Sequence, residues 1–272
     1  MSLILTLGPK GDEWKYNKET KVYDLTRGAS SPRLTLRTTH GSPDTSITVA
    51  PALSALVVVD MQNFFIHPRC NEHPTGLAAV DRTLEVIKRC RETGIKIIWL
   101  NWGLSDDDLE HMPAATQRSF AKSLITPPLD NKQARSGFGS DMGDDRGRLL
   151  MAGSWNARLY DPLRDASQAD SDIFCDKDRI SGFWHGETSL AKALAASGYR
   201  TLLFAGVNTD QCVLGTLADA YYRGWDCIMV EDCCATKTPN GHDVTIYNAS
   251  GYGFVVDSRS IVEGILGSGT QS

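Results

Sequence analysis

Residues 201–232 read TLLFAGVNTDQCVLGTLADAYYRGWDCIMVED and contain two apolar runs separated by a helical pattern. The runs TLLFAG (201–206) and DCIMVED (226–232) are short, rich in β-forming residues and apolar on both faces. Such runs are typical of strands in a parallel sheet that helices cover on both sides. Between them, residues 211–223 carry a helical pattern that stops at Gly224, and glycine is favourable just after a helix. The stretch therefore predicts a strand–helix–strand unit.

The same alternation extends over most of the chain. Further strand-like runs lie at Ala55–Asp60 (ALVVVD), Lys96–Asn101 (KIIWLN), Asp172–Asp176 (DIFCD) and Gly253–Asp257 (GFVVD). Helical patterns fill gaps between them at Gly76–Thr93 and Thr188–Ser197, and a glycine follows each. Strands that alternate with helices of this length form right-handed units in an open sheet. We expect an α/β fold, Rossmann-like and three-layered, with a doubly wound, mainly parallel sheet of about six strands and helices on both faces.

The N-terminal segment departs from this rhythm. Residues 1–50 are rich in Thr, Ser, Gly, Pro and charged side chains, and within them Lys15–Leu25 and Ser31–Thr38 alternate as short strands do. We expect residues 1–50 to form an N-terminal extension that packs on the main domain, residues 51–272, or on a neighbouring subunit.

A second irregular segment, residues 104–153, looks like an insertion in the main domain. It is rich in Gly, Asp, Arg and Pro, and it predicts a helix near Ala114–Leu124 followed by a long loop. Its acidic run Asp106–Asp108 is interpreted as a solvated loop or the start of a helix. Long loops inside compact α/β domains are often lids or binding loops, so we expect one of these roles here.

Composition and charge exclude several classes of protein. The 272 residues are 41% hydrophobic and 22% charged, as in ordinary globular proteins, and the net charge is −5. Lys and Arg form no basic stripe, so we expect no nucleic-acid partner. The N-terminal apolar run is too short for a signal peptide, has no basic residue before it, and no other stretch approaches the length of a membrane span. We expect a cytoplasmic protein without a membrane partner.

Three chemically active side chains lie at predicted strand ends: Asp60, Lys177 and Cys212. In open parallel sheets, ligands bind beyond the carboxyl ends of the strands, so the three residues can converge on one point. A thiol at a helix start beside an ammonium is favoured as the thiolate, and a carboxylate can take the thiol proton and later pass it to a leaving amine. Ordinary structural roles stay open at this point, because a loop-capping Asp, a solvated Lys and a core thiol would give the same pattern.

Cys212 is one of seven cysteines, and the other six show no comparable placement. The cysteines lack the paired spacing of zinc sites, and in a chain without a secretion signal they are expected to be free thiols. Most free thiols are small buried hydrophobes, so the position of Cys212 after a strand and at a helix start is what distinguishes it.

Three motifs together resemble the isochorismatase-like cysteine hydrolases. They are ALVVVDMQNFF (55–65), KDRISGF (177–183) and GVNTDQCVLGTLADAYYRGWDCIMVEDCCAT (206–236), and they occur in the family's order within a resemblance from about Leu53 to Asp257. The resemblance implies a catalytic triad of Asp60, Lys177 and Cys212. It also implies a cis peptide between Val207 and Asn208, with the backbone amides of Asn208 and Cys212 forming an oxyanion hole.

Two differences from the family pattern bear on the metal site and on the pocket entrance. The nicotinamidases of the family hold a metal with an Asp and His cluster after the second strand, whereas this chain reads NWGLSDDDLEH (101–111), with only a distant His111. We therefore predict no metal and no cofactor, and disfavour nicotinamidase activity. Phe64 stands where the family more commonly has Asp, which affects only the shape of the pocket entrance.

The segment GFWHGETSL (182–190) is longer than usual for the family and predicts a pocket wall specific to this chain. The residues expected to contact a small-molecule substrate are Gln62, Phe65, Trp102, Arg179, Phe183, Trp184 and His185, with the Asn208 side chain as a further polar contact. Trp184 and His185 fit a subunit contact equally well. By resemblance we expect a homo-oligomer, either a dimer or a tetramer.

Three functions follow as hypotheses. The first is metal-free cysteine hydrolysis of a C–N bond in a small amide, carbamoyl or ureido compound, through a thioester-type acyl-enzyme. The second is hydrolysis of the isochorismate vinyl ether to pyruvate and a dihydroxybenzoate precursor, for which some family members need no cysteine; Arg179 or Arg158 would then receive the dianion. The third is a non-catalytic binding or effector protein on the same fold. The presence of Cys212 favours the first hypothesis.

Overall fold

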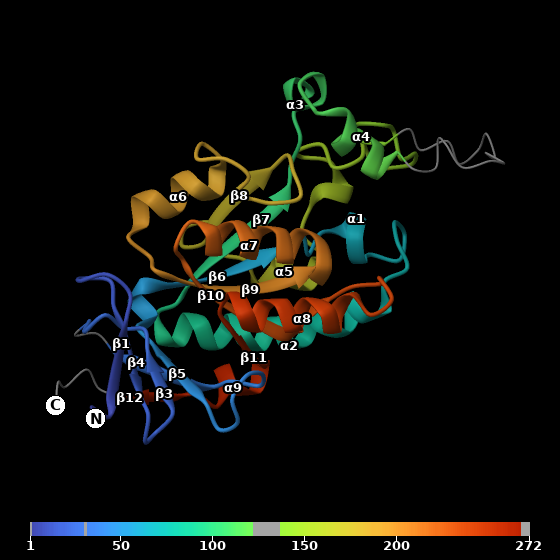
Figure 1. The fold of residues 1–272 in the computed structure, drawn as a ribbon. Helices are drawn as coiled ribbons and strands as arrows, with labels where there is room; N and C mark the ends of the chain where they lie inside the picture. Colours follow the sequence, from blue (N-terminus) through green and yellow to red (C-terminus); the bar gives the residue numbers. More distant parts are fainter. Residues whose placement is uncertain (1, 30–31, 122–136, 268–272) are drawn as a thin grey trace.

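The computed structural model describes residues 2–29, 32–121 and 137–267, and two sheets organise them (Figure 1). The main sheet has six parallel strands in the order β11-β10-β9-β6-β7-β8. Their bounds are β6 (Ser54–Val59), β7 (Lys96–Trp102), β8 (Ile173–Lys177), β9 (Thr201–Val207), β10 (Asp226–Ala235) and β11 (Phe254–Val256). The chain runs outward from β6 to β8 and then returns to the other side of β6, which confirms the doubly wound fold.

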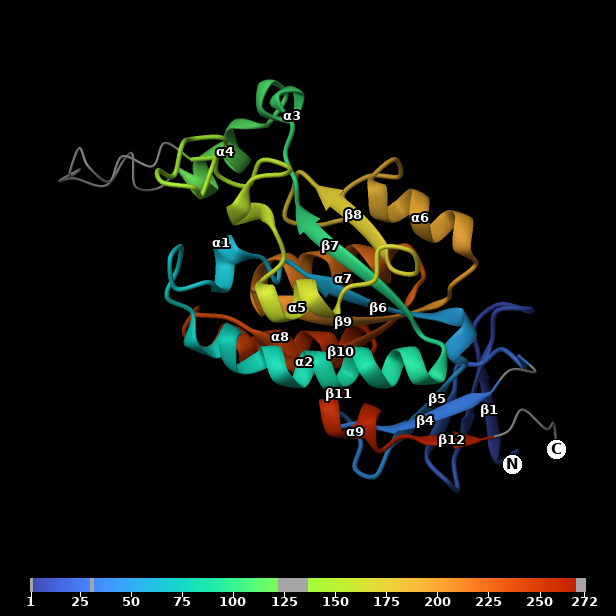
Figure 2. The same ribbon diagram turned by 180° about the vertical axis from the view of Figure 1, so that it is seen from behind.

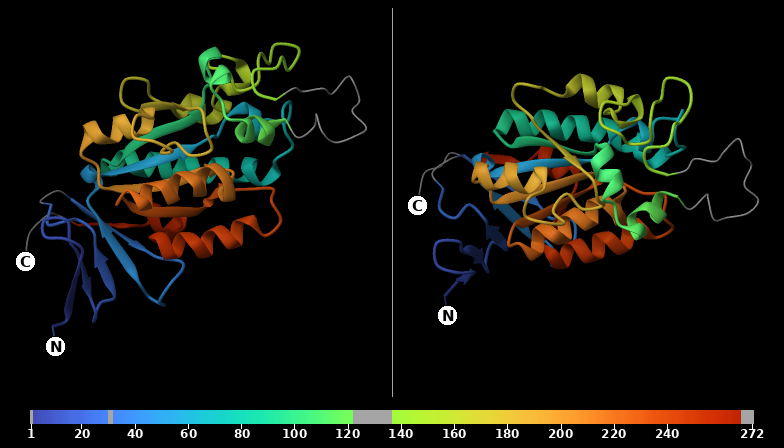
Figure 3. Two further views of the ribbon diagram at one scale, coloured as in Figure 1. Left: turned by 45° about the horizontal axis from the view of Figure 1, so that its top comes forward. Right: turned by 90° about the horizontal axis from the view of Figure 1, so that it is seen from above.

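Helices cover both faces of this sheet, so the molecule has three layers there (Figures 2 and 3). One face carries α2 (Pro74–Thr93), α5 (Asp161–Ala166) and α9 (Ser258–Val262). The other face carries α6 (Ser189–Ser197), α7 (Leu214–Tyr222) and α8 (Gly241–Tyr252). The predicted glycine stops are confirmed at Gly94 and Gly198, which both adopt the left-handed conformation after their helices.

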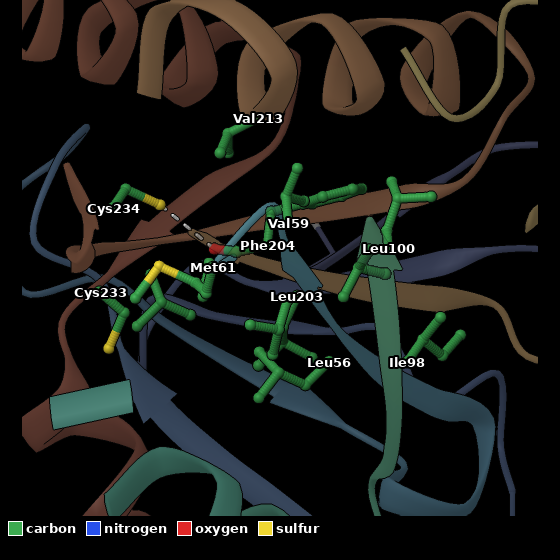
Figure 4. Close-up of a cluster of buried hydrophobic side chains, with 14 of the residues drawn as sticks. Leu56, Val59, Met61, Ile98, Leu100, Leu203, Phe204, Val213, Cys233 and Cys234 are labelled. Carbon is green, nitrogen blue, oxygen red and sulfur yellow. Dashed lines mark hydrogen bonds between the residues drawn. The ribbon is translucent and has the colours of Figure 1, made fainter. Parts of the chain in front are cut away.

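The core lies between these layers, and the central strands supply much of it (Figure 4). Every residue of β6 and β9 is buried, which explains why both read as continuous apolar runs. The two strands approach closely at Gly206, where a Cβ would lie 2.0 Å from the carbonyl oxygen of Val59. Gly206 also has a φ of +123°, a conformation that L side chains rarely adopt. This close approach brings the carboxyl ends of β6 and β9 together.

A second sheet, built from both ends of the chain, lies at the amino ends of the main strands (Figure 1). Its order is β1-β2-β3-β5-β4-β12. The bounds are β1 (Ile4–Leu7), β2 (Trp14–Asn17), β3 (Val22–Asp24), β4 (Arg33–Arg37), β5 (Ser46–Val49) and β12 (Ile265–Gly267). The C-terminal strand β12 pairs with β4, so this sheet contains residues from outside the first fifty.

The segment predicted as one strand at Lys15–Leu25 consists instead of β2 and β3, joined by a tight turn. The side chain of Asn17 accepts hydrogen bonds from the amides of Glu19 and Thr20, and Lys21 has a φ of +54°. An Asn that hydrogen-bonds the backbone just ahead of it favours a turn over an extended strand. The alternation seen in the sequence therefore belongs to a hairpin.

Asp226 joins the N-terminal sheet to the main domain. It lies at the start of β10, is 2% exposed, and accepts hydrogen bonds from Trp14 Nε1 (2.8 Å), both terminal nitrogens of Arg27 (2.6 and 2.8 Å) and Thr201 Oγ1 (2.8 Å). Trp14 and Arg27 come from the N-terminal segment, whereas Thr201 begins β9. A buried carboxylate with four donors is well compensated, so this contact fixes how the two sheets dock.

The insertion at 104–153 begins with α3 (Asp106–Glu110) and α4 (Ala114–Phe120). The acidic run predicted as a helix start is the first turn of α3, capped by Ser105. The helix predicted near 114–124 is described as α4 only to Phe120, and residues 122–136 of the expected long loop lie outside the described residues. Among the described residues, no helix is long and apolar enough to cross a membrane.

Candidate active site

Asp60, Lys177 and Cys212 meet at the carboxyl ends of the main strands. Asp60 directly follows β6, Lys177 is the last residue of β8, and Cys212 lies in a short π-helical turn, Thr209–Val213, between β9 and α7. Strand order reverses at the β6–β9 pair, which is the place where open α/β sheets bind ligands. The topology therefore places all three side chains in one crevice.

Lys177 bridges the other two residues. Its Nζ lies 2.9 Å from Asp60 Oδ2 and 3.5 Å from Cys212 Sγ, and it also donates a hydrogen bond to the carbonyl oxygen of Arg179 (3.1 Å). Asp60, Lys177 and Cys212 are 0%, 3% and 3% exposed. Opposite charges this close in a dry site interact strongly, so the ammonium holds the carboxylate and the sulfur in a fixed relation.

Burial dominates the protonation of the thiol. It raises the pKa of Cys212 to about 12; the Lys177 ammonium acts in the opposite direction, and the Asp60 carboxylate raises the pKa further. The resting sulfur is therefore a thiol. The ammonium favours the thiolate, as expected from the sequence, but the loss of solvent outweighs that effect at rest.

Burial also raises the pKa of Asp60, against the lowering effects of Lys177 and of hydrogen bonds from Cys212 and the Trp102 amide. Asp60 has a φ of +50°, an uncommon conformation for a non-glycine residue. Such conformations are concentrated at functional sites. A carboxyl group with an elevated pKa beside a protonated thiol is suited to accept the thiol proton.

The peptide bond between Val207 and Asn208 is cis, as the resemblance implies. It ends β9 and leads into the turn that carries Cys212, where the amides of Gln211 and Val213 both donate to the Asn208 carbonyl. The backbone amides of Asn208 and Cys212, predicted as the oxyanion hole, thus flank a single short turn beside the thiol.

Gln62, predicted as a substrate contact, is fully buried and bonded to backbone. Its side-chain nitrogen donates to the carbonyl oxygens of Trp102 (2.7 Å) and Ala157 (2.6 Å), and its side-chain oxygen accepts from the Trp102 amide (3.0 Å). These bonds tie the chain after β6 to the end of β7 and to the turn at Trp155–Ala157. In this structure Gln62 supports the site instead of facing a ligand.

Aromatic side chains surround Lys177 on the side of the insertion. The Lys177 ammonium lies 3.9 Å from the centre of a Trp102 ring, and Phe120 and Phe138 pack on Trp102 with ring centroids at 5.4 and 4.9 Å. Phe65, the other aromatic residue predicted here, is buried in α1 (Asn63–Ile66). The sequence argument missed Phe120 and Phe138, because nothing in their spacing connects the insertion with Trp102.

The residues predicted to form a pocket wall at 179–185 lie in different environments in the structure. Arg179 touches Lys177 through its carbonyl oxygen, and its guanidinium stacks on Trp184 at 4.8 Å. Phe183 is 1% exposed, and its ring packs against the guanidinium of Arg223 at 5.3 Å.

Trp184 and His185 lie farther out along the same loop. Trp184 is 44% exposed and its indole nitrogen donates to Asp178 (3.0 Å), while His185 accepts from the amide of Glu187 (2.9 Å). Both side chains stabilise their own loop. Of the residues predicted here, Arg179 is the one that hydrogen-bonds a central residue in the described structure, through its carbonyl oxygen.

His73 is a site residue that the sequence argument did not find. It is buried, caps the start of α2 by accepting from the Gly76 amide at Nδ1 (2.9 Å), and its Nε2 lies 2.8 Å from the side-chain oxygen of Asn208. Because Nδ1 accepts, the ring proton is on Nε2 and is donated to Asn208. Asn208, expected to contact substrate, is therefore oriented by His73, and no sequence signal links positions 135 residues apart.

No group of three or more His, Cys, Asp or Glu side chains with metal-binding geometry occurs within residues 2–29, 32–121 and 137–267. His111, in the stretch compared with the metal ligands of the nicotinamidases, caps the end of α3 and bonds to the Asp107 carbonyl oxygen (2.9 Å).

Similar sequences are found among known proteins. Residues 54–260 match the isochorismatase family, which is described as "Isochorismatase domain". The ureidoacrylate amidohydrolase RutB of Acinetobacter baylyi is 30% identical over 251 residues, covering 89% of this chain and 94% of that protein. RutB of Klebsiella variicola is 27% identical and covers 79% of this chain and 88% of that protein.

Solved structures are similar as well. N-carbamoylsarcosine amidase from Thermoplasma acidophilum is 29% identical with a TM-score of 0.55, covering 75% of this chain and 96% of that structure. Nicotinamidase PncA from Bacillus subtilis is 20% identical with a TM-score of 0.56, covering 75% of this chain and 99% of that structure; it supports the fold alone.

Proposed function

Because this chain belongs to the isochorismatase family of hydrolases, we propose that it is a cysteine hydrolase that cleaves the C–N bond of a small amide, carbamoyl or ureido compound. The observation that carries the proposal is the placement of Lys177 Nζ within 2.9 Å of Asp60 and 3.5 Å of Cys212. A nucleophile, a base and a cation that holds both are the parts that acyl transfer requires.

In the first step, Asp60 accepts the proton of Cys212 as the sulfur attacks the substrate carbonyl. The C–S bond forms, and the carbonyl π electrons move onto oxygen. The backbone amides of Asn208 and Cys212 are the donors that we assign to this oxyanion, and each such donor lowers the barrier by about 3 kcal/mol. Lys177 keeps the proton-transfer partners together while charge moves between them.

In the second step, the C–N bond breaks and the proton held by Asp60 passes to the departing nitrogen. The amine or ammonia leaves, and a thioester remains on Cys212. A water molecule then attacks this thioester while Asp60 takes one of its protons, and the proton returns to the sulfur as the acid is released. Overall, one water is consumed for each C–N bond cleaved, and the enzyme is regenerated.

The relatives support a ureido or carbamoyl substrate over a plain amide. The names of the similar proteins specify ureidoacrylate and N-carbamoylsarcosine as their substrates. Both compounds carry a carbonyl flanked by nitrogen, and a nucleophilic thiol suits that group. We therefore place N-carbamoyl and ureido compounds first in a substrate search.

The test is to incubate the purified protein with ureidoacrylate, an N-carbamoyl amino acid and a simple amide, and to measure ammonia or amine release. Acid quenching during turnover should leave an acyl group on the Cys212 peptide, detectable by mass spectrometry. Cys212→Ser should lower turnover by at least about a thousandfold. Cys175→Ala is the matched control, because Cys175 is buried two residues before Lys177 and has no role in the proposal.

Two results would contradict the proposal. Release of pyruvate from isochorismate, with no activity on C–N bonds and no dependence on Cys212, would assign the chain to vinyl-ether hydrolysis. A Cys212 thiol no more reactive toward iodoacetamide than the other six cysteines would instead indicate a binding protein on this fold.

A further inference from the structure

Trp102, the last residue of β7, contacts two of the three central residues in different ways. Its backbone amide donates to Asp60 Oδ1 (3.2 Å), and its ring lies under the Lys177 ammonium at 3.9 Å. Trp102 is 1% exposed, so both contacts are shielded from water. Trp102 therefore lies at the reacting centre itself. This is more than the substrate contact that was predicted for it.

The indole N–H of Trp102 adds a third contact. It is buried and has no acceptor at ordinary hydrogen-bond geometry among the residues that the structure describes, but it lies within reach of the Cys212 sulfur. Donation from this N–H toward the sulfur favours the ionised form of Cys212, because it lowers the pKa of that thiol. A neutral thiol is a poor acceptor, whereas a thiolate is a strong one. The donor is thus weakly satisfied at rest and gains a strong acceptor when the thiol ionises.

Trp99, three residues earlier in the same strand, shows that this arrangement is specific to Trp102. It is equally buried, and its indole nitrogen donates to Asp172 Oδ2 at 2.9 Å. Buried indole N–H groups usually find such a partner. Packing against Phe120 and Phe138 explains why the ring of Trp102 is buried here. It does not explain why the indole N–H lacks an acceptor of ordinary geometry.

We propose that Trp102 is a catalytic residue whose indole N–H stabilises the thiolate of Cys212 during attack, while its ring and amide hold Lys177 and Asp60 in place. The proposal rests on the nucleophilic role proposed for Cys212. The proton moves from the sulfur to Asp60, and the N–H···S hydrogen bond strengthens as negative charge appears on sulfur. No bond to Trp102 forms or breaks. This is preorganised stabilisation of a charge that exists only during reaction.

The test measures the rate of Cys212 alkylation by iodoacetamide as a function of pH, with the modified peptide identified by mass spectrometry. Trp102→Phe keeps a ring for Lys177 and the backbone amide for Asp60 but removes the N–H. The pKa of Cys212 should rise by about one unit, so alkylation near pH 8 should be about tenfold slower. The kcat on the substrate found in the search should fall by a similar factor, with KM within about twofold.

Trp99→Phe is the matched control, since it removes the N–H of a buried tryptophan in the same strand. It should leave the pH dependence of Cys212 alkylation unchanged. Should Trp102→Phe fail to fold, benzothienylalanine at position 102 keeps the shape of the indole and lacks only the N–H. It should give the same shift.

The outcomes are distinct. An unchanged pH dependence in either position-102 variant, with reactive Cys212 in the wild type, overturns the role of Trp102 and leaves the cysteine hydrolase intact. An unreactive Cys212 in the wild type overturns the proposed function itself. A shift of equal size in Trp99→Phe would show that loss of any buried indole N–H in β7 has this effect, and would also overturn the proposal.

Discussion

At Asp60, burial and a neighbouring ammonium act on one carboxyl group in opposite directions. Burial raises its pKa, and Lys177 lowers it. If Asp60 is the base, activity requires its ionised form and is lost as pH falls through this raised pKa. We expect kcat/KM to show an acid limb above the usual range for Asp and then a plateau through neutral pH, because the thiol proton passes to Asp60 and not to solvent. Initial rates across the pH range measure this.

A profile that instead rises steadily toward the pKa of the free thiol would contradict this prediction, since it would mean that the reactive species is a thiolate formed before substrate binds. Asp60→Asn is the informative variant: it should abolish the acid limb together with most of the activity. The unfolding free energy of that variant should be measured alongside, because Lys177 would lose its buried partner.

His73 lies one hydrogen bond away from the residue that carries the cis peptide. Replacing it by leucine removes the donor to Asn208 and the cap of α2. We expect His73→Leu to lower kcat about tenfold with little change in KM, and to lower the free energy of unfolding by about 1–2 kcal/mol from loss of the cap and the buried bond. Steady-state kinetics and chemical denaturation give the two numbers.

His111→Leu is the control for His73, because His111 is an exposed residue at the end of α3. It should change neither kcat nor stability. A His73 variant that loses stability and keeps kcat would show that His73 serves only as a helix cap.

At the scale of elements, Asp226 fixes the N-terminal sheet on the ends of β9 and β10. Asp226→Asn would leave the mostly buried Arg27 without its main partner, and breaking a buried ion pair costs about 3–5 kcal/mol. We expect that loss in urea denaturation, together with faster proteolysis within residues 1–50. Asp44→Asn is the control, because the Asp44–Lys21 pair is exposed and such pairs contribute little. Equal effects of the two substitutions would refute the docking role of Asp226.

The elements of the main domain were predictable because their signals are local. β6 and β9 are buried on both faces and so read as unbroken apolar runs, and Gly94 and Gly198 mark where two helices end. The strand ends located Asp60, Lys177 and Cys212 for the same reason. The hairpin at 15–25 was missed, since alternation alone does not reveal the turn that Asn17 stabilises.

The rest of the site depends on contacts between distant segments, and these leave little trace in one sequence. The side chain of Gln62 hydrogen-bonds backbone groups of Trp102 and Ala157, and Phe183 packs against Arg223. The raised pKa of Cys212 is likewise a product of burial, which position at a helix start does not reveal. Neighbours in space, more than neighbours in sequence, decide these properties.

At the scale of the whole molecule, β1 is an edge strand whose residues are all exposed. Its apolar side chains Leu5 and Leu7 are 43% and 40% exposed. Open apolar edges favour pairing with another chain, so we predict that the protein is a dimer or tetramer with β1 at an interface. Light scattering after size exclusion should give a multiple of the 29.8 kDa chain mass.

Leu5→Lys/Leu7→Lys should lower that mass toward a monomer. Val244→Lys, on the exposed side of α8, serves as the control and should leave the assembly unchanged. A monomeric wild type would disprove the prediction, and dissociation by Val244→Lys alone would move the interface to another face.

The pairing of β12 with β4 also has a consequence for biosynthesis. Strand β4 (Arg33–Arg37) leaves the ribosome long before its partner β12 (Ile265–Gly267) is translated. While the main domain is being translated, the edge of β4 therefore lacks its partner, and the sheet is completed only after residues 265–267 have left the ribosome. Truncation before residue 265 would leave that edge open permanently, and an open strand edge exposes the protein to aggregation.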